Sequence, residues 1–270
     1  MPAVSQALVE FANHHRERSE PGIEVIVTPR YEITLQPDFP VPGPNSVRWV
    51  RCTAEEADDV IREARARVAP RHLPLAWILD PETRPGAFAD RLLAHGIGPD
   101  PHGLESKVMV LSSDATILAP PVAGLEIVDA LRDPEAFQQA DRAAAEAFGA
   151  ESMGEDERRI AARERRRRNL LAAGHRHLLL ARVDGEPAGS GSLGLYPPAG
   201  AKMNGGSVRA KFRGRGVYRA LVAARVDIAR RAGVAGLAVW GGDMSRPILE
   251  RLGFEVVGWR RFYVDSSTAG

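Results

Sequence analysis

The chain has 270 residues, and the 44% of them that are hydrophobic are enough to fill the core of one large domain or of two ordinary ones. Lysine and arginine number 36 against 35 aspartate and glutamate, so the net charge of +1 gives no reason to expect nucleic acid or an anionic membrane as a partner, and we expect neither. The single cysteine, Cys52, excludes an intrachain disulfide framework and a multi-cysteine zinc site, and it agrees with a reducing cytoplasm, where we expect the protein.

The sequence has no recognisable targeting or membrane-spanning segment. The first 20 residues carry many charged side chains and no uninterrupted apolar run, so they do not resemble a signal peptide. Nowhere do ~18 consecutive apolar residues occur, which is about the minimum for a transmembrane helix. We therefore expect a soluble protein.

The first part of the chain alternates strand and helix patterns. Apolar residues at helical spacing predict helices, and apolar residues that alternate with polar or β-branched ones predict strands. The order is a helix over 4–17, strands over 23–27, 31–35 and 47–50, a helix from Thr53 to 68 with Glu56 completing a capping box, a strand over 75–79, a helix over 85–95 ending at Gly96, and a strand over 108–111. This order predicts an α/β domain over residues 1–115.

A linker follows. Residues 114–124 contain Pro120-Pro121 and small residues, with no clear periodicity. We therefore place a linker at 116–124 and a second domain at 125–270.

The second domain begins with a strand and two helices and continues with a sheet. Asp184-Gly185 is a strong signal for a hairpin turn between two of its strands. The predicted elements are a strand over 125–128, helices over 134–148 and 155–173, strands over 177–183, 186–196 and 206–212, a helix over 217–232, a strand over 237–240, a helix over 246–252, and a bent strand or strand pair over 254–264.

A glycine-rich loop lies between the strand at 206–212 and the helix at 217–232. Its sequence is Arg213-Gly214-Arg215-Gly216-Val217-Tyr218. The glycines allow a tight turn that exposes successive N–H groups, and the helix N-terminus adds about half a positive charge, so the loop is suited to bind an anion. It lacks the Lys-Ser/Thr pair of a nucleoside-triphosphate P-loop, and no acidic residue follows at the distance that a dinucleotide fold needs.

With this loop the sequence resembles the GNAT acyltransferase superfamily, whose hallmark is R/Q-x-x-G-x-G/A between a strand and a helix. Arg213 and Gly216 match the motif, and the order of elements over about 125–264 matches the fold. The segment from Ser245 to Phe254 looks like the family's last helix with its closing Gly-Phe pair. The resemblance implies a mixed, mostly antiparallel sheet flanked by helices, acetyl-CoA or another acyl-CoA as co-substrate, and no metal.

The resemblance also implies roles for individual residues. Backbone groups around Val208 and Arg209 would hold the pantetheine arm of CoA, and the amides from Arg215 to Tyr218 would hold the pyrophosphate, reinforced by the side chains of Arg213 and Arg215. The cofactor-binding residues are therefore Val208, Arg209, Arg213, Gly214, Arg215, Gly216, Val217 and Tyr218. The other interpretation of the loop is a plain surface turn.

The sequence departs from the family's pattern at two positions and in one strand. Tyr218 stands where the family has a small residue. Leu249 stands where many members have the tyrosine that protonates the leaving thiolate, and a hydrocarbon side chain cannot donate a proton. The strand at 206–212 has no carboxylate that could act as the general base found there in some relatives. Another group or water must carry the protons, or the chain is not an ordinary amine acetyltransferase.

Two polar residues near the predicted last helix are catalytic candidates. Asp243 follows the strand at 237–240 and is a base or a helix cap. Ser245 opens the last helix, and its hydroxyl either donates to sulfur or caps the helix. Tyr196 could face the acceptor or pack in the core, and Trp240 belongs to the core or to a wall of the acyl pocket.

Two basic features have both a functional and a plain interpretation. Residues 158–168 contain seven arginines against one acid, Glu164. They could receive an acidic substrate or carrier protein, or they form a solvated helix face. His175 and His177 share one face of a strand, but without a third ligand we expect no metal there.

The first domain repeats part of the second. A strand containing Trp77, followed by the helix that ends at Gly96, echoes the segment from Trp240 to Gly253. This looks like a degenerate GNAT-like half, as in tandem members of the superfamily. It has no R-x-x-G-x-G loop, so we expect it to bind no CoA and to pack against the catalytic half or shape the acceptor cleft.

By this resemblance we expect transfer of an acetyl or other short acyl group from acyl-CoA to an amine of a small molecule by direct attack. Backbone N–H groups beside the splayed strands would polarise the thioester carbonyl. Cys52, in the degenerate half, is not expected to form an acyl-enzyme. The alternatives are an acyltransferase that acts with a carrier-protein-bound substrate and a non-catalytic CoA-binding protein.

Overall fold

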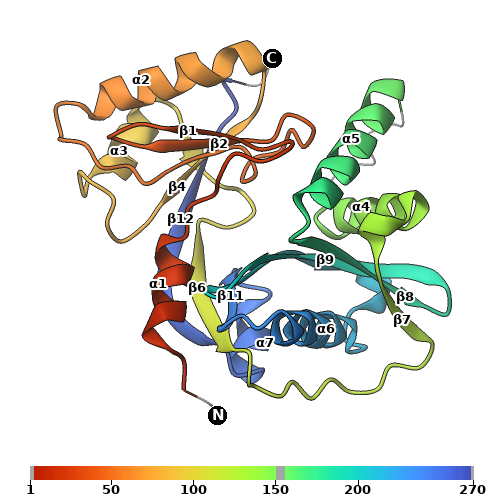
Figure 1. Ribbon diagram of the computed structural model, residues 1–270. Coiled ribbons are helices and arrows are strands. Elements are labelled where there is room, and N and C mark those ends of the chain that lie inside the picture. Colours follow the sequence, from red (N-terminus) through yellow and green to blue (C-terminus); the bar gives the residue numbers. More distant parts are fainter. Residues whose placement is uncertain (1–2, 150–155, 269–270) are drawn as a thin grey trace. The chain divides into compact units, whose positions relative to one another are not determined.

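The computed structural model describes residues 3–149 and 156–268 (Figure 1). The chain divides into two compact units. Unit 1 comprises Met1–His15 and Val108–Val257, and unit 2 comprises Arg16–Lys107 and Gly258–Gly270. Two strands, β6 (Glu105–Ser112) and β12 (Glu255–Asp265), run across the boundaries of this division.

Unit 1 is built on a mixed, mostly antiparallel sheet, as expected. Its strand order is β6-β11-β10-β9-β8-β7. The pairs β7–β8, β8–β9 and β9–β10 are antiparallel, whereas β10 and β11 are parallel. The strands have these bounds: β7 Leu125–Asp129, β8 Arg176–Val183, β9 Glu186–Tyr196, β10 Gly200–Val208 and β11 Gly236–Gly241. The predicted turn at Asp184-Gly185 joins β8 and β9, with both residues at positive φ.

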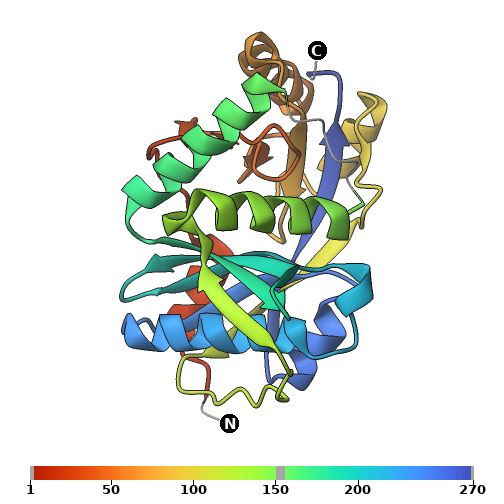
Figure 2. The same cartoon turned by 90° about the vertical axis from the view of Figure 1, so that its right-hand side faces the viewer.

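Helices cover both faces of this sheet (Figure 2). Leu180 packs with Ala136 and Ala140 of α4 on one face, and its neighbour Leu179 packs with Leu221 of α6 on the other, because successive side chains of a strand point to opposite faces. The helical segments are η2 Ala130–Arg132, α4 Pro134–Ala147, α5 Glu157–Ala173, η3 Ala210–Phe212, α6 Val217–Arg231 and α7 Arg246–Arg251.

The N-terminal helix α1 (Gln6–His14) also belongs to unit 1. Its apolar face buries Leu8 and Phe11 in a cluster with Val110 of β6 and Ala238 of β11. Gly200 allows this close approach, since a Cβ atom there would lie 2.5 Å from the Phe11 ring. This packing explains why a helix from the beginning of the chain is part of the same unit as strands from its end.

The division into units therefore differs from the predicted boundary at residues 116–124. The first 15 residues and the strand from Val108 join unit 1, and the last residues from Gly258 join unit 2. The second exchange arises because the end of β12 pairs antiparallel with β4, with Tyr263 opposite Trp77.

The predicted linker lies along α6. Near the C-terminal end of this helix, Arg230 donates from Nε to the carbonyl of Ser113 at 3.0 Å and from Nη2 to the carbonyl of Ala115 at 2.8 Å. Near the N-terminal end, a Cβ atom on Gly216 would lie 2.9 Å from the ring of Pro120. The segment is thus held against the helix at both ends.

Unit 2 has the strand order β1-β2-β3-β4-β12, with β5 also paired to β12. The pair β3–β4 is parallel, and α2 connects its two strands. Trp77 and Phe88 lie in its core with ring centroids 5.8 Å apart. The bounds are β1 Glu24–Val27, β2 Glu32–Leu35, β3 Ser46–Arg48, α2 Ala57–Val68, η1 Ala69–Arg71, β4 Leu75–Leu79, α3 Phe88–Ala94 and β5 Gly98–Pro99.

One predicted strand is displaced. The strand expected at 206–212 is β10, which begins at Gly200 and ends at Val208, and residues 210–212 form the short helix η3 instead. The early residues of β10 extend the hairpin with β9, which places Met203 opposite Leu193. Over residues 3–149 and 156–268, no helix combines the length and apolar character needed to cross a membrane.

Candidate active site

The parallel strands β10 and β11 separate partway along their length. Their ladder ends where Met203 lies opposite Val239. Strand β10 continues to Val208 and β11 to Gly241, and the described residues contain no pairing between the two strands beyond that point. Two backbone edges are therefore left facing an opening in the sheet.

A β-bulge in β10 lies directly after this point. It occurs between Asn204 and Ser207 in the pairing with β9, and Gly205 within it has a φ of +57°. A bulge turns backbone groups out of the regular ladder. The irregular segment of β10 thus presents backbone at the opening.

The glycine-rich loop leads from η3 into α6. Gly214 has a φ of +75° and Gly216 a φ of +90°, which is the left-handed region that favours glycine. Gly216 caps α6 without a side-chain hydrogen bond, and within the described part of the chain the first-turn amides of Val217, Tyr218 and Arg219 have no acceptor. The loop therefore offers unpaired N–H groups and the positive end of the helix dipole to an anion.

The two arginines of the loop differ in what they do. Arg213 donates from Nε to the carbonyl of Val208 at 3.1 Å and from Nη2 to the carbonyl of Ala147 at 3.2 Å, so it braces the loop. Arg215 is exposed, and its guanidinium lies 5.4 Å from the centre of the Phe212 ring. Arg215 is thus the loop side chain better placed to supply charge to a ligand.

The two predicted pantetheine residues lie at the end of β10, and part of their backbone is already bonded. The amide of Arg209 donates to the carbonyl of Ala188 at 2.9 Å, and the carbonyl of Val208 accepts from Arg213. The Arg209 side chain pairs with Glu146 at 2.7 Å and with Glu186 at 2.9 Å. The edge left for a ligand therefore lies nearer the bulge than the sequence indicated.

Tyr218 is half-buried in the first turn of α6, and its ring lies against the bulge. A Cβ atom on Gly206 would be 3.0 Å from Cε2 of this ring and 3.6 Å from its hydroxyl oxygen. Burial raises the pKa of Tyr218, while Arg225 and the nearby Ser245 act in the opposite direction.

Arg225 is a site residue that the sequence analysis missed. It lies on α6, is 1% exposed, and donates from Nε to the carbonyl of Leu221 at 3.0 Å. Its Nη2 atom is buried without a hydrogen-bond partner among the described residues. Burial lowers the pKa of Arg225, and Tyr218 partly offsets this effect. The available signal was its spacing of four residues from Leu221, which places it on the apolar side of the helix.

The two predicted catalytic residues, Asp243 and Ser245, differ in their exposure to solvent. Asp243 is exposed in the turn before α7. Ser245 is partly buried, does not cap α7 with its side chain, and donates to the carbonyl of Gly242 at 3.4 Å. Leu249, at the position where the family has its tyrosine, is fully buried in the core of unit 1 and packs among apolar side chains.

On the α1 side of the sheet, aromatic and basic side chains gather near the end of β9. Tyr196 packs between Phe11, at 5.7 Å between ring centroids, and His175, at 5.3 Å. Arg176 lies 5.6 Å from the Tyr196 ring centre. Tyr196 therefore packs against other side chains. Nearby on β10, the Lys202 ammonium lies 6.0 Å from the centre of the Trp240 ring.

His177, by contrast, is paired with Asp129 at 2.7 Å. Burial raises the pKa of Asp129, but hydrogen bonds from His177 and from the amides of Leu131 and Leu178 outweigh it, so this pKa lies below its usual range. The part of the chain that the structure describes contains no group of three or more His, Cys, Asp or Glu side chains suited to hold a metal ion.

The arginine-rich segment lies on α5 and is partly engaged within unit 1. Arg166 pairs with Asp141 at 2.6 Å and lies 5.0 Å from the centre of the Phe137 ring. Arg167 pairs with Glu164 at 2.7 Å and donates to the carbonyl of Leu131 at 2.8 Å. These contacts fix α5 to α4 and η2 and leave the exposed arginines of 158–168 on the solvent side.

Known proteins resemble the part of the chain that holds this site. Residues 137–254, which include the bulge, the loop and all of α7, match the Acetyltransferase (GNAT) family. No match was found among curated proteins.

Solved structures share the fold over most of the chain. A GCN5-related N-acetyltransferase from Kribbella flavida is 17% identical and aligns over 90% of both chains, with a TM-score of 0.62. A functionally unknown conserved protein from Staphylococcus epidermidis ATCC 12228 is 13% identical over 91% of this chain and 95% of its own, with a TM-score of 0.64. A tandem GNAT protein from the clavulanic acid biosynthesis pathway is 18% identical over 92% and 84%, with a TM-score of 0.59. At these identities the likeness concerns the fold.

Proposed function

Because this chain belongs to the GNAT superfamily of N-acyltransferases through its domain at residues 137–254, we propose that it transfers an acetyl or other short acyl group from acyl-CoA to an amine of a small molecule. The observation that carries this proposal is the geometry of the loop before α6. Its unpaired amides, two left-handed glycines and exposed Arg215 form a site for a diphosphate, and the opening between β10 and β11 begins next to it.

The proposed reaction is direct attack of the amine on the thioester carbonyl. The opening after Met203 provides the place for the thioester between two strands that no longer pair. Backbone N–H groups of the bulge at Asn204–Ser207 could polarise the carbonyl oxygen without any side chain. The segment has no charged side chain of its own, so positioning and backbone polarity supply the catalysis there.

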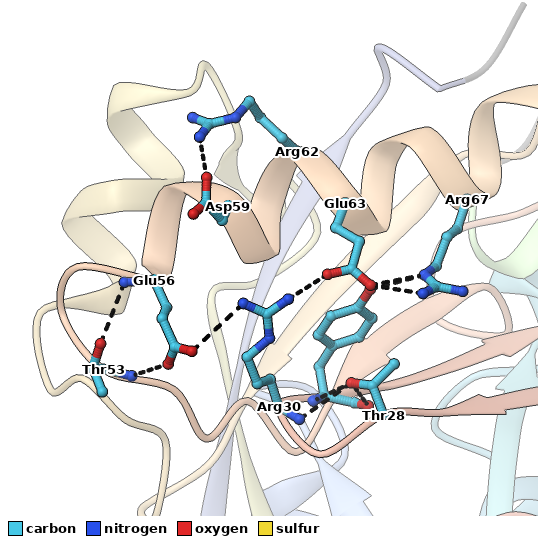
Figure 3. A network of polar contacts seen from close by, with 9 residues as sticks. Thr28, Arg30, Thr53, Glu56, Asp59, Arg62, Glu63 and Arg67 are labelled. Atoms are coloured by element: carbon cyan, nitrogen blue, oxygen red, sulfur yellow. Dashed lines mark hydrogen bonds and ion pairs between the residues drawn. The ribbon is translucent and has the colours of Figure 1, made fainter.

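We further propose that unit 2 is a degenerate GNAT-like unit that does not bind CoA. Its parallel pair β3–β4 with connecting helix α2 has the same order as β10, α6 and β11. Figure 3 shows Glu56 in front of α2, bonded to Thr53 and paired with Arg30. Asp58 and Asp59 lie in the first turn of the helix. These carboxylates lie at the positive N-terminal end of α2, where a diphosphate would otherwise bind, and would repel it.

The proposed compartment is the cytoplasm, because a chain with one cysteine makes no use of an oxidising environment. For the acceptor, we propose a small amine rather than a nucleic acid or a membrane component. The near-neutral net charge of +1 supports this choice.

The CoA proposal can be tested by calorimetric titration of the chain with acetyl-CoA and with longer acyl-CoAs. Arg215→Glu puts an anion beside the loop and should weaken acetyl-CoA binding by about tenfold, or about 1.4 kcal/mol. Arg231→Glu is the matched control, since it makes the same charge change on an exposed residue at the other end of α6. Glycine variants are less suitable, because Gly216 has a φ of +90° and any side chain would be strained.

Equal affinity of the wild type and Arg215→Glu for acetyl-CoA would contradict the proposed diphosphate site, and so would an equal loss in the Arg231→Glu control. Absence of binding by the wild type to every acyl-CoA would remove the proposed function altogether. Turnover is then measured by release of free CoA thiol with a panel of small amines. Tight binding with no turnover would favour a non-catalytic CoA-binding protein.

The exposed arginines of α5 favour one alternative, an acyltransferase that acts with a carrier-protein-bound substrate. Arg158, Arg165 and Arg168 are exposed on this helix. If they receive an acidic carrier protein, reversing their charges should abolish activity with a carrier-bound substrate and leave activity with a free amine unchanged. Equal effects on both substrates would exclude the carrier.

A further inference from the structure

The guanidinium of Arg225 is buried in unit 1, and the described residues give it no acidic partner. Of the described residues, Tyr218 is the only ionisable group that acts on its pKa. A buried cation without a counter-ion is costly, because it loses its hydration. Its Nη2 atom lacks any hydrogen-bond partner in the described part of the chain, so an acceptor for this proton is missing.

The position of Arg225 is fixed by two glycines on the neighbouring strands. A Cβ atom on Gly191 of β9 would lie 2.9 Å from Nη1, and one on Gly206 of β10 would lie 3.4 Å from Nη2. The hydroxyl oxygen of Tyr218 lies 3.6 Å from that same point at Gly206. The cation and the hydroxyl therefore both lie beside Gly206 in the bulge of β10.

The proposed reaction needs a proton at this opening. When the carbon–sulfur bond of a thioester breaks, sulfur leaves as a thiolate, which is a better leaving group when a nearby acid protonates it. Leu249 is a fully buried hydrocarbon and cannot serve. Asp243 is exposed in the turn before α7, and Ser245 donates to the carbonyl of Gly242. This leaves Tyr218, whose hydroxyl lies beside Gly206 in the bulge.

We propose that the Tyr218 hydroxyl is the proton donor to the departing CoA sulfur and that Arg225 is a positioning residue that stabilises the phenolate left behind. The inference rests on the acyl-CoA reaction proposed above. The amine nitrogen forms a bond to the carbonyl carbon, and the carbon–sulfur bond breaks with its electron pair on sulfur. Sulfur takes the proton of Tyr218, and the phenolate takes, through water, the proton that the nitrogen loses.

The proposed reaction explains the environments of Tyr218 and Arg225. The buried cation lowers the pKa of Tyr218 and so stabilises the phenolate that forms during transfer. Burial raises the pKa of Tyr218, so the hydroxyl is protonated before each turnover. Ser245, in the turn before α7, also favours the charged form of Tyr218. The larger residue at this position of the loop thereby compensates for the leucine at 249.

The test compares Tyr218→Phe with the wild type in two measurements, calorimetric affinity for acetyl-CoA and steady-state kinetics with a small amine. Removing the hydroxyl alone should lower kcat by about 10²-fold or more and change the Kd for acetyl-CoA by less than about threefold. The matched control is Tyr263→Phe, which removes the hydroxyl of a buried tyrosine in unit 2 and should leave kcat unchanged.

Arg225→Met provides the second arm, because methionine fills the space without the charge. Loss of the cation raises the pKa of Tyr218 further, which makes it a weaker acid. We expect kcat at neutral pH to fall about tenfold, and the loss of activity at alkaline pH to begin at a higher pH than in the wild type. A residue that only packs would lower the stability without moving this alkaline limb.

Three results would overturn the inference while leaving the proposed function intact. The first is a Tyr218→Phe variant that keeps kcat within threefold of a wild type that binds and turns over acetyl-CoA. The second is tighter acetyl-CoA binding and faster turnover in Tyr218→Ala, which would mark the ring as an obstacle in the opening. The third is a preference for acyl-CoAs with a terminal carboxylate that disappears in Arg225→Met, which would make Arg225 a subsite for the acyl group. A wild type without acyl-CoA binding would instead refute the proposed function itself.

Discussion

At the residue scale, small residues decide how closely the elements of unit 1 approach one another. A Cβ atom on Gly236, at the start of β11, would lie 2.3 Å from the backbone oxygen of Leu111 and 2.5 Å from Leu8 of α1. We expect Gly236→Ala to lower the free energy of unfolding by about 3 kcal/mol, because backbone has to move to admit the methyl group. Urea unfolding checks this.

The control for this prediction is Gly98→Ala. Gly98 lies in β5, has nothing within 4 Å of its Cβ position and needs no positive φ. Its substitution should change stability by less than about 0.5 kcal/mol. Equal effects of the two substitutions would show that the close approach of α1 to β6 and β11 is not a real constraint.

A second residue-scale prediction concerns Asp265 in unit 2, whose carboxylate accepts from Arg65 at 2.6 Å. Burial raises the pKa of Asp265, but the bonds from Arg65 and Ser267 outweigh it, so the pKa lies below its usual range. A depressed carboxyl pKa stabilises the fold above the unfolded value of about 3.9, and this stability is lost as the pH falls through the folded pKa. Asp265→Asn should therefore cost about 3 kcal/mol at pH 7, and the difference from wild type should shrink below about pH 4.

Chemical unfolding of wild type and Asp265→Asn at neutral and acidic pH measures this difference. Asp227→Asn serves as the comparison, since Asp227 pairs with Arg230 at 2.8 Å on an exposed helix surface, where an ion pair contributes little. If the cost of Asp265→Asn stayed constant down to acidic pH, the ion pair with Arg65 would not be its source.

At the scale of elements, the turn that leads into α2 was readable from the sequence, although α2 begins at Ala57 and not at the predicted Thr53. Thr53 and Glu56 bond reciprocally, with the Thr53 amide donating to the Glu56 carboxylate at 2.9 Å and the Glu56 amide donating to Thr53 Oγ1 at 3.4 Å. Removing the hydroxyl in Thr53→Ala should destabilise unit 2 by about 1 kcal/mol. Thr116→Ala, at an exposed position of the linker, is the neutral counterpart in the same urea titration.

The loop before α6 was also predictable, because its glycine spacing and its place between strand and helix are local features. The environment of its last residue was not. Tyr218 lies beside Gly206, and Arg225 lies beside Gly191, through contacts between segments that are separate in the sequence. Sequence periodicity can place Arg225 on the apolar face of α6 but does not give the strand beneath it, so its neighbours could not be foreseen.

At the scale of the whole molecule, the alternation of strands and helices predicted the fold class but not the division into units. The boundary expected at 116–124 divides the chain into two consecutive domains. In the structure, residues 1–15 belong to unit 1 with the later part of the chain, and residues 258–270 belong to unit 2 with the earlier part. Long-range contacts assign the last residues to unit 2, among them the register of β12 against β4, with Val264 opposite Ala76, and the ion pair between Arg65 and Asp265. Such long-range pairings leave no local pattern in the sequence.

The exchange predicts how fragments behave. A fragment comprising residues 116–270 lacks α1 and all of β6, and so loses Leu8, Phe11 and Val110 from the core of unit 1. We expect it to unfold without a cooperative transition in urea, with circular dichroism as the readout. A sharp transition in this fragment would mean that α1 and β6 are dispensable for unit 1.

The exchanged ends also set an order for folding during synthesis. Helix α1 leaves the ribosome early, but its partner Ala238 is made after most of the chain has emerged. Unit 2 likewise waits for residues from Gly258 onward before β4 gains its neighbour β12. Neither unit can close while translation is at its midpoint, so the nascent protein exposes apolar surface for longer than a chain of two consecutive domains would, and we expect its yield in cells to depend on chaperones.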